Sequence, residues 1–182
     1  MDINKVKSVY FIGAGGIGMS ALVRYFLTMG YKVGGYDKTP SPLTSQLIEE
    51  GADIHFEENV DMIADCFRDK GTTLVVYTPA VPSEHAELVY FRTNGFEVQK
   101  RAQLLGFLTQ KHKGLCVAGT HGKTTTSAML AHLMHQSHVD CNAFWVESQK
   151  IMALTTYCPK RVNMWWWKQM NSTGRFIGYV RI

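Results

Sequence analysis

The sequence lacks the features that mark metal-cluster, secreted and membrane proteins. None of its four cysteines (Cys66, Cys116, Cys141, Cys158) belongs to a CxxC pair, so neither a zinc site nor a disulfide framework is indicated. No apolar run approaches the roughly 18 residues that a membrane-spanning helix needs. A strand-like segment begins at residue 8, so no signal peptide is expected. These absences predict a protein of the reducing cytoplasm without a membrane partner.

Acidic residues are scarce in one part of the chain only. Residues 145–182 hold six basic residues and a single acidic one, Glu147, whereas residues 1–144 hold 13 basic and 14 acidic residues. The formal net charge of +4 therefore arises wholly in the last segment, which also holds all four tryptophans. The overall composition, 46% hydrophobic and 19% charged, is that of a globular protein. We therefore do not take the net charge as a sign of a nucleic-acid partner.

Short apolar strands alternate with helical segments through the first hundred or so residues, an α/β pattern. A first helix is expected after residue 18, with Leu22, Tyr25, Phe26 and Met29 on one face. Two further helices are expected at residues 41–50, capped by Ser41, and at residues 84–94. Strands are expected at residues 8–12, 31–37, 53–56, 73–78 and 96–99. This alternation predicts a Rossmann-like parallel sheet covered on both faces, forming a domain over residues 1–110.

A second unit is expected to start near residue 111. Residues 114–118 resemble a buried strand, and a helix over residues 123–136 follows a glycine-containing loop. We place the domain boundary at residues 109–113. Residues 111–144 would then be the truncated start of a P-loop ATP-binding domain, because only one strand and one helix precede the change in composition.

The first glycine loop, Gly13-x-Gly15-x-x-Gly18, lies between a predicted strand and a predicted helix. Glycine permits the tight turn and a close backbone approach, and a helix N-terminus favours a phosphate. Asp37 follows the second strand, where a ribose-binding carboxylate often lies. The pattern predicts a dinucleotide or a nucleotide-diphosphate sugar as ligand; the alternative is a turn that only lets the helix pack on the strand.

The second loop, Gly119-Thr120-His121-Gly122-Lys123-Thr124-Thr125, is the more specific one. At a strand-to-helix turn, backbone amides cradle phosphates, Lys123 would reach the β- and γ-oxygens, and the Thr124 hydroxyl would hold Mg²⁺. The spacing departs from a strict Walker A loop, because Val117 occupies the position of its first glycine. A dehydrogenase needs only the first loop and an ordinary kinase or GTPase only the second, whereas an enzyme that joins ATP to a nucleotide-activated acid needs both.

At these residues the chain resembles the Mur ligases of peptidoglycan synthesis, and among them the alanine-adding branch. The matching stretches lie within residues 8–144: GAGGIGMSAL, GYDKTPSPLTSQLIEEGADI, VVYTPAVPSEHAEL, RAQLLGFL and AGTHGKTTTSAMLAHL. The resemblance implies a ligase in which ATP phosphorylates the carboxylate of UDP-N-acetylmuramate and the amine of L-alanine then attacks the acyl phosphate. It also implies three domains, which bind the UDP-sugar, ATP and the amino acid.

The resemblance also implies roles for individual residues. Lys123 would stabilise charge in the phosphoryl transfer, and Thr124 would hold Mg²⁺. The UDP-sugar would be bound by Gly13, Gly15, Gly16, Ile17 and Gly18, with Asp37 at the nucleoside end. ATP would be bound by Gly119, Thr120, His121, Gly122, Lys123, Thr124 and Thr125.

The family pattern stops after Phe144. Shifted by one base, codons for Met164-Trp165-Trp166-Trp167-Lys168 onward can encode Val-Val-Val-Glu, the acidic strand end that the family has there. We therefore hypothesise that residues 145–182 are a frameshifted, poorly ordered tail, which the gene sequence around codon 145 would test. The resulting chain would lack the acids of the second domain and the whole third domain, so we expect it to be inactive as a ligase.

Three other interpretations remain. His132, His135 and His138 recur at helical spacing, which permits a metal site but more simply indicates a solvated helix face. The tryptophans and basic residues of the tail permit a non-catalytic nucleotide- or UDP-sugar-binding module with an aromatic interaction surface. The first loop alone would also suit an NAD-dependent dehydrogenase, which the second loop argues against.

Overall fold

The computed structural model describes residues 5–110, 113–117, 120–137, 142–144 and 164–167. The chain divides into two compact units, Met1–Leu104 and Leu105–Ile182, and each is described by itself. The division falls within helix α4 (Arg101–Gln110), a few residues before the boundary expected from the sequence. The proposed limits at 110 and 144 remain predictions.

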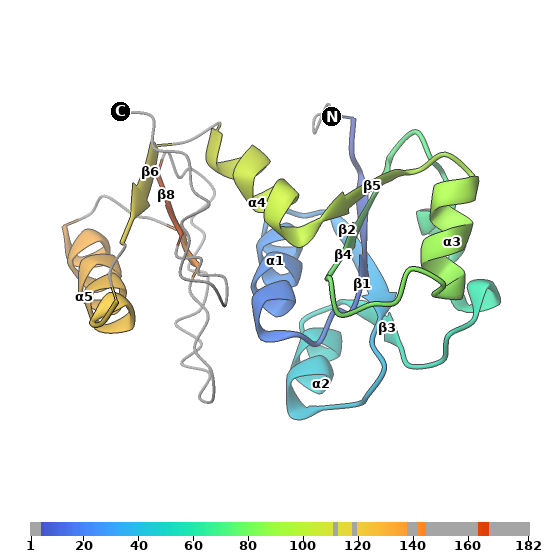
Figure 1. Ribbon diagram of the computed structural model, residues 1–182, viewed down its shortest axis with the longest axis horizontal. Helices are drawn as coiled ribbons and strands as arrows, with labels where there is room; N and C mark the ends of the chain where they lie inside the picture. The colour runs from blue at the N-terminus through green and yellow to red at the C-terminus, as the bar shows by residue number, and fades with distance from the viewer. Residues whose placement is uncertain (1–4, 111–112, 118–119, 138–141, 145–163, 168–182) are drawn as a thin grey trace. The chain divides into compact units, whose positions relative to one another are not determined.

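The first unit is built on a five-stranded parallel sheet with the strand order β3-β2-β1-β4-β5 (Figure 1). Its strands are β1 Ser8–Ile12, β2 Lys32–Tyr36, β3 Asp53–His55, β4 Thr73–Tyr77 and β5 Glu97–Lys100. This is the doubly wound order in which ligands bind beyond the carboxyl ends of the strands. The predicted α/β, Rossmann-like architecture is confirmed, with strand bounds within a few residues of those expected.

Each face of the sheet packs against different elements, because neighbouring residues of a strand point to opposite faces. Phe11 of β1 packs against Phe26 of α1 (Ile17–Thr28), with ring centroids 6.2 Å apart. Tyr10 lies on the other face, 4.9 Å from Phe91 of α3 (Ala86–Thr93) and 5.4 Å from Phe67. Two short 3₁₀ turns, η1 Val60–Met62 and η2 Asp65–Phe67, complete that second layer.

One predicted helix end is confirmed and another differs from the prediction. Ser41 caps α2 (Pro42–Glu49) through its hydroxyl, which accepts from the Thr44 amide at 3.1 Å, and the Thr44 hydroxyl accepts from the Ser41 amide at 2.8 Å. The prediction that Met29 belongs to the apolar face of α1 is wrong. Met29 is the C-terminal cap of that helix and is 45% exposed, because the helix ends before its side chain can turn toward the sheet.

The second unit contains a three-stranded parallel sheet with the order β6-β8-β7 and the helix α5 (Lys123–Gln136) (Figure 1). Its strands are β6 Lys113–Cys116, β7 Asn142–Phe144 and β8 Met164–Trp167. Strand β6 and helix α5 lie where the sequence predicts them. Strand β8 is a segment of the expected tail; residues 145–163 and 168–182 lie outside the described residues.

Among the described residues, no helix combines the length and apolar character needed to cross a bilayer.

Candidate functional site

The first glycine loop connects β1 to α1 at the carboxyl edge of the sheet. Gly13 has a positive φ of 87°, and a Cβ there would lie 2.7 Å from Cγ2 of Thr78, so both its backbone and its surroundings require glycine. Gly16 is the N-cap of α1 and provides no side-chain cap, and the first turn holds no acidic residue. The positive end of the α1 dipole therefore has no carboxylate of its own helix beside it.

Asp37 lies directly beyond β2 and turns toward this loop. Its Oδ2 accepts a hydrogen bond from the Gly15 amide at 2.6 Å, and its Oδ1 accepts one from the Thr39 amide at 3.2 Å. A Cβ on Gly15 would lie 2.6 Å from Cγ2 of Thr44 and 3.0 Å from Asp37 Oδ2. The structure thus brings the predicted residues Gly15 and Asp37 together, with the carboxylate on the loop backbone. The predicted contact of Asp37 with a nucleoside stays a prediction.

The second glycine loop leads into α5. Gly122 has a φ of 74°, in the left-handed region that favours glycine, and its carbonyl accepts from the Thr126 amide at 2.9 Å. The Lys123 ammonium donates to the Thr120 carbonyl at 2.6 Å, so the side chain folds back over the loop and is 9% exposed. Thr120, His121, Gly122 and Thr125 are exposed. Gly119 and the side chain of Thr124 lie outside the described residues.

No group of three His, Cys, Asp or Glu residues able to hold a metal ion occurs within the described part of the chain. His132 is exposed on α5, whereas the His135 side chain and His138 lie outside that part. The exposure of His132 agrees with the solvated helix face that the sequence favours, and the alternative of a histidine metal site is not tested.

A buried polar cluster lies near the carboxyl edge of the first sheet, and the sequence analysis did not predict it. Tyr10 is 1% exposed and Glu87 0%, and their side chains are joined by a 2.7 Å hydrogen bond from the tyrosine hydroxyl to Oε2. The same hydroxyl lies 2.7 Å from Nε2 of His55, the last residue of β3. The signal in the sequence was Glu87 itself, an acidic residue beside the apolar positions Leu88 and Phe91 of α3.

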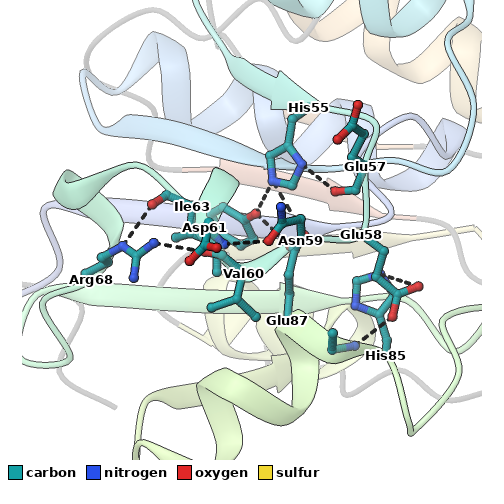
Figure 2. Close-up of polar contacts among 12 residues, drawn as sticks. His55, Glu57, Glu58, Asn59, Val60, Asp61, Ile63, Arg68, His85 and Glu87 are labelled. Atoms are coloured by element: carbon teal, nitrogen blue, oxygen red, sulfur yellow. Dashed lines mark hydrogen bonds and ion pairs between the residues drawn. The ribbon is translucent and has the colours of Figure 1, made fainter.

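A second histidine–glutamate pair lies beside this cluster (Figure 2). Nε2 of His85 is 3.8 Å from Glu58 Oε2, and the His85 ring is 4.6 Å from the Tyr36 ring, measured between centroids. Neither ring nitrogen of His85 has a hydrogen-bond partner within the described part of the chain. Burial lowers the pKa of His85, since a charged imidazole would lose its hydration there.

Known proteins share the sequence of this chain over most of its length. The family model of the Mur ligase catalytic domain matches residues 8–113. The UDP-N-acetylmuramate–L-alanine ligase of Phocaeicola vulgatus is 74% identical over 144 residues, which is 79% of this chain and 31% of that protein. The ligase of the same name from Parabacteroides distasonis is 69% identical over 144 residues, again 79% of this chain and 31% of that protein. The chain thus spans about a third of the length of the curated relatives it matches.

The fold also matches a solved structure. The UDP-N-acetylmuramate-alanine ligase of Thermotoga maritima superposes with a TM-score of 0.72 at 26% identity, covering 88% of this chain and 37% of that one. The family match, the high identity to these relatives and the two glycine loops agree with one another. This chain belongs to the Mur ligase family.

Proposed function

We propose that this chain is the UDP-sugar-binding domain and the beginning of the ATP-binding domain of a ligase that joins L-alanine to UDP-N-acetylmuramate. The observation that carries the proposal is the pair of glycine loops, each at a strand-to-helix turn in a different compact unit. A dehydrogenase would need only the first loop, whereas activation of an acid by ATP also needs the second.

The first loop would receive the diphosphate of the UDP-sugar. Because Gly13 and Gly15 have no side chains, the loop can turn sharply and pass close to Thr78 and Asp37. The backbone of Gly16, Ile17 and Gly18 at the start of α1 would face the phosphate oxygens, where the helix dipole favours negative charge. Asp37 holds the Gly15 amide and would position the loop beside the nucleoside.

The second loop fits ATP and Mg²⁺, with a lysine and a left-handed glycine at the start of a 14-residue helix. ATP, when bound, would supply the phosphoryl group that turns a carboxylate into an electrophile. Lys123 would leave the Thr120 carbonyl and bind phosphate oxygens, and Thr124 would contribute its hydroxyl to the magnesium ion. Gly119, Thr120, His121, Gly122 and Thr125 would line the phosphates. We place such an enzyme in the cytoplasm.

We also propose the three segments 1–110, 111–144 and 145–182 as the UDP-sugar domain, the start of the ATP domain and a tail that is not part of the family pattern.

Isothermal titration of the full chain with UDP-N-acetylmuramate and with NAD tests the assignment of the first loop. We expect the UDP-sugar to bind and NAD not to bind. Gly16→Ala is the informative variant, because Gly16 has an ordinary φ of −66° and a Cβ there meets no atom closer than 3.7 Å. The methyl group should leave the fold intact and lower the affinity about tenfold, a cost of about 1.4 kcal/mol.

Gly71→Ala is the matched control, since Gly71 lies in a turn of the same unit and its nearest neighbour is the side chain of Asp69. It should leave the affinity unchanged. Binding of NAD in place of the UDP-sugar, or equal affinities in Gly16→Ala and the unmodified chain, would contradict the proposal.

A further inference from the structure

The hydrogen-bond partners of His55 determine which ring nitrogen carries a proton. Nδ1 lies 2.9 Å from the backbone carbonyl oxygen of Glu57 (Figure 2). A carbonyl oxygen can only accept, so Nδ1 must carry the hydrogen of this contact. In neutral His55 the other nitrogen, Nε2, then has no hydrogen and acts as an acceptor toward Tyr10.

The Tyr10 hydroxyl has one hydrogen and two partners that can both be acceptors. It lies 2.7 Å from His55 Nε2 and 2.7 Å from Glu87 Oε2. With neutral His55 and ionised Glu87, the hydroxyl can donate to one of them only, and the other short contact joins two acceptors. One additional proton removes the conflict.

That proton has two possible places, one that leaves His55 and Glu87 as an ion pair and one that leaves both neutral. On His55 Nε2 it is donated to the tyrosine oxygen, while the tyrosine hydrogen is donated to Glu87. On Glu87 Oε2 it is donated to the tyrosine oxygen, while the tyrosine hydrogen is donated to His55. With a proton on both groups, Oε2 of Glu87 can accept the tyrosine hydrogen only if the carboxyl proton lies on Oε1, and Oε1 has no hydrogen-bond partner within the described part of the chain. The two contacts of Tyr10 therefore need one proton, and a second proton would lack an acceptor.

We infer that His55 and Glu87 share a single proton through the hydroxyl of Tyr10, and that this proton makes the stability of the first unit depend on pH. Two acceptors in contact destabilise the fold here because the site is buried and water cannot replace the missing hydrogen bond. Tyr10 is 1% exposed, Glu87 0%, and the side chain of His55 10%. The inference concerns the fold alone and needs no ligand.

The ionisation of the three groups agrees with this arrangement. Burial raises the pKa of Glu87 to about 7, although the Tyr10 hydroxyl and the Asn59 amide favour its charged form. Burial lowers the pKa of His55, which the Glu57 carbonyl partly opposes. Burial, with the Glu87 carboxyl beside it, raises the pKa of Tyr10, so the hydroxyl keeps its hydrogen.

Other charged or titratable groups lie around Tyr10, His55 and Glu87 and influence the pKa values in this region. They come from β3, the loop after it, η2 with its C-terminal cap, and the start of α3: Asp53, Glu57, Glu58, Arg68 and His85.

The sign of the pH effect follows from the shifted pKa values of Glu87 and His55. The folded chain holds the proton up to about pH 7, whereas an unfolded glutamate releases it near its ordinary pKa. Taken alone, this shift contributes stability that is full below the ordinary pKa of glutamate and is lost as the pH rises to about 7. The lowered pKa of His55 acts in the opposite direction, because its contribution is present above the ordinary pKa of histidine and is lost as the pH falls. Together the two shifts make the pair most stabilising while it holds a single proton. On the acid side, a second proton on the pair would break the network again.

Nuclear magnetic resonance of the full chain tests the shared proton directly. The ring nitrogens of His55 and the carboxyl carbon of Glu87 should titrate with one common midpoint, because the proton belongs to the pair. In Tyr10→Phe only the 3.6 Å contact between His55 Nε2 and Glu87 Oε1 still couples the two groups, so their midpoints should move apart. Tyr36→Phe removes a hydroxyl from the neighbouring strand and should keep the common midpoint. Separate midpoints in the unmodified chain would overturn the inference.

Glu87→Gln provides an independent test by urea unfolding between pH 5.5 and 8.5. The glutamine amide donates to Tyr10 permanently, so the decline in stability that Glu87 should cause in the unmodified chain as the pH rises from 5.5 to about 7 should be absent. At pH 8.5 the variant should be at least as stable as the unmodified chain. A variant that is less stable by the same amount at every pH would show that Glu87 acts as a fixed carboxylate, against the inference.

Discussion

Two adjacent glycines in β2 lie where no side chain fits. A Cβ on Gly35 would be 2.1 Å from the backbone oxygen of Phe11 in the neighbouring strand β1. A Cβ on Gly34 would be 2.4 Å from the ring of Phe67, which closes the other layer of the unit. Glycine is ordinarily unfavourable in a strand, so its presence here reflects close approach of neighbouring atoms.

Gly35→Ala should destabilise the first unit by about 3 kcal/mol, because the methyl group meets rigid backbone and the strands must separate. Urea unfolding followed by circular dichroism measures the change. Gly71→Ala, whose methyl group meets only the exposed side chain of Asp69, should change the unfolding free energy by less than about 1 kcal/mol. Equal effects of the two substitutions would refute the role assigned to Gly35.

The start of helix α3 is stabilised from another element. Its N-cap residue, His85, makes no side-chain capping bond, and the Ala86 amide instead donates to Glu58 Oε1 at 2.8 Å. The carboxylate of Glu58 thus satisfies one of the unpaired amides of the first turn and lies at the positive end of the helix dipole. The loop after β3 and helix α3 are thereby joined.

Glu58→Ala should lower the unfolding free energy by about 1 kcal/mol, the usual cost of losing an N-terminal cap. Hydrogen exchange of the α3 amides should increase together with the loss of stability. The control is Glu57→Ala, since Glu57 is adjacent and exposed and its side chain makes no hydrogen bond or ion pair described for this unit. Faster exchange in α3 of the Glu57 variant alone would contradict this explanation.

At the scale of the whole molecule, the two units carry different parts of the proposed reaction. The first has the five-stranded Rossmann-like sheet, whereas the second has three described strands, helix α5 and the end of helix α4. The chain spans 31% of its relative from Phocaeicola vulgatus. Catalysis by positioning needs all binding groups held in one geometry, and about two thirds of the length of that relative lies outside the match.

We therefore expect the 182-residue chain to release no phosphate when mixed with UDP-N-acetylmuramate, ATP, Mg²⁺ and L-alanine. A coupled phosphate assay measures this, with the complete ligase of Phocaeicola vulgatus as the positive control. Sustained turnover by this chain alone would show the expectation to be wrong. Binding of the UDP-sugar without turnover is the outcome that agrees with both this expectation and the proposed function.

Local sequence was sufficient for the elements whose signals are local. The strand at residues 8–12 and the helix at residues 123–136 have the predicted bounds, because apolar runs and glycine turns mark their ends. Helix α4 was not predicted: it begins at Arg101 directly after β5, without a turn signal between them. Strands β7 and β8 are only three and four residues long. They are defined by pairing, β7 with β8 and β8 also with distant β6.

The sequence by itself determined the family, the alternation of strands and helices, and the position of both glycine loops, since each depends on residues close together in the chain. Only the tertiary structure decided that the Asp37 carboxylate binds the Gly15 amide and that Tyr10 joins His55 to Glu87. These contacts connect residues separated by 22, 45 and 77 positions. Asp37 reaches the loop because β2 pairs with β1, and Tyr10 meets Glu87 because α3 packs on the face of the sheet where the Tyr10 ring lies. No local pattern encodes which hydroxyl a buried carboxyl will face.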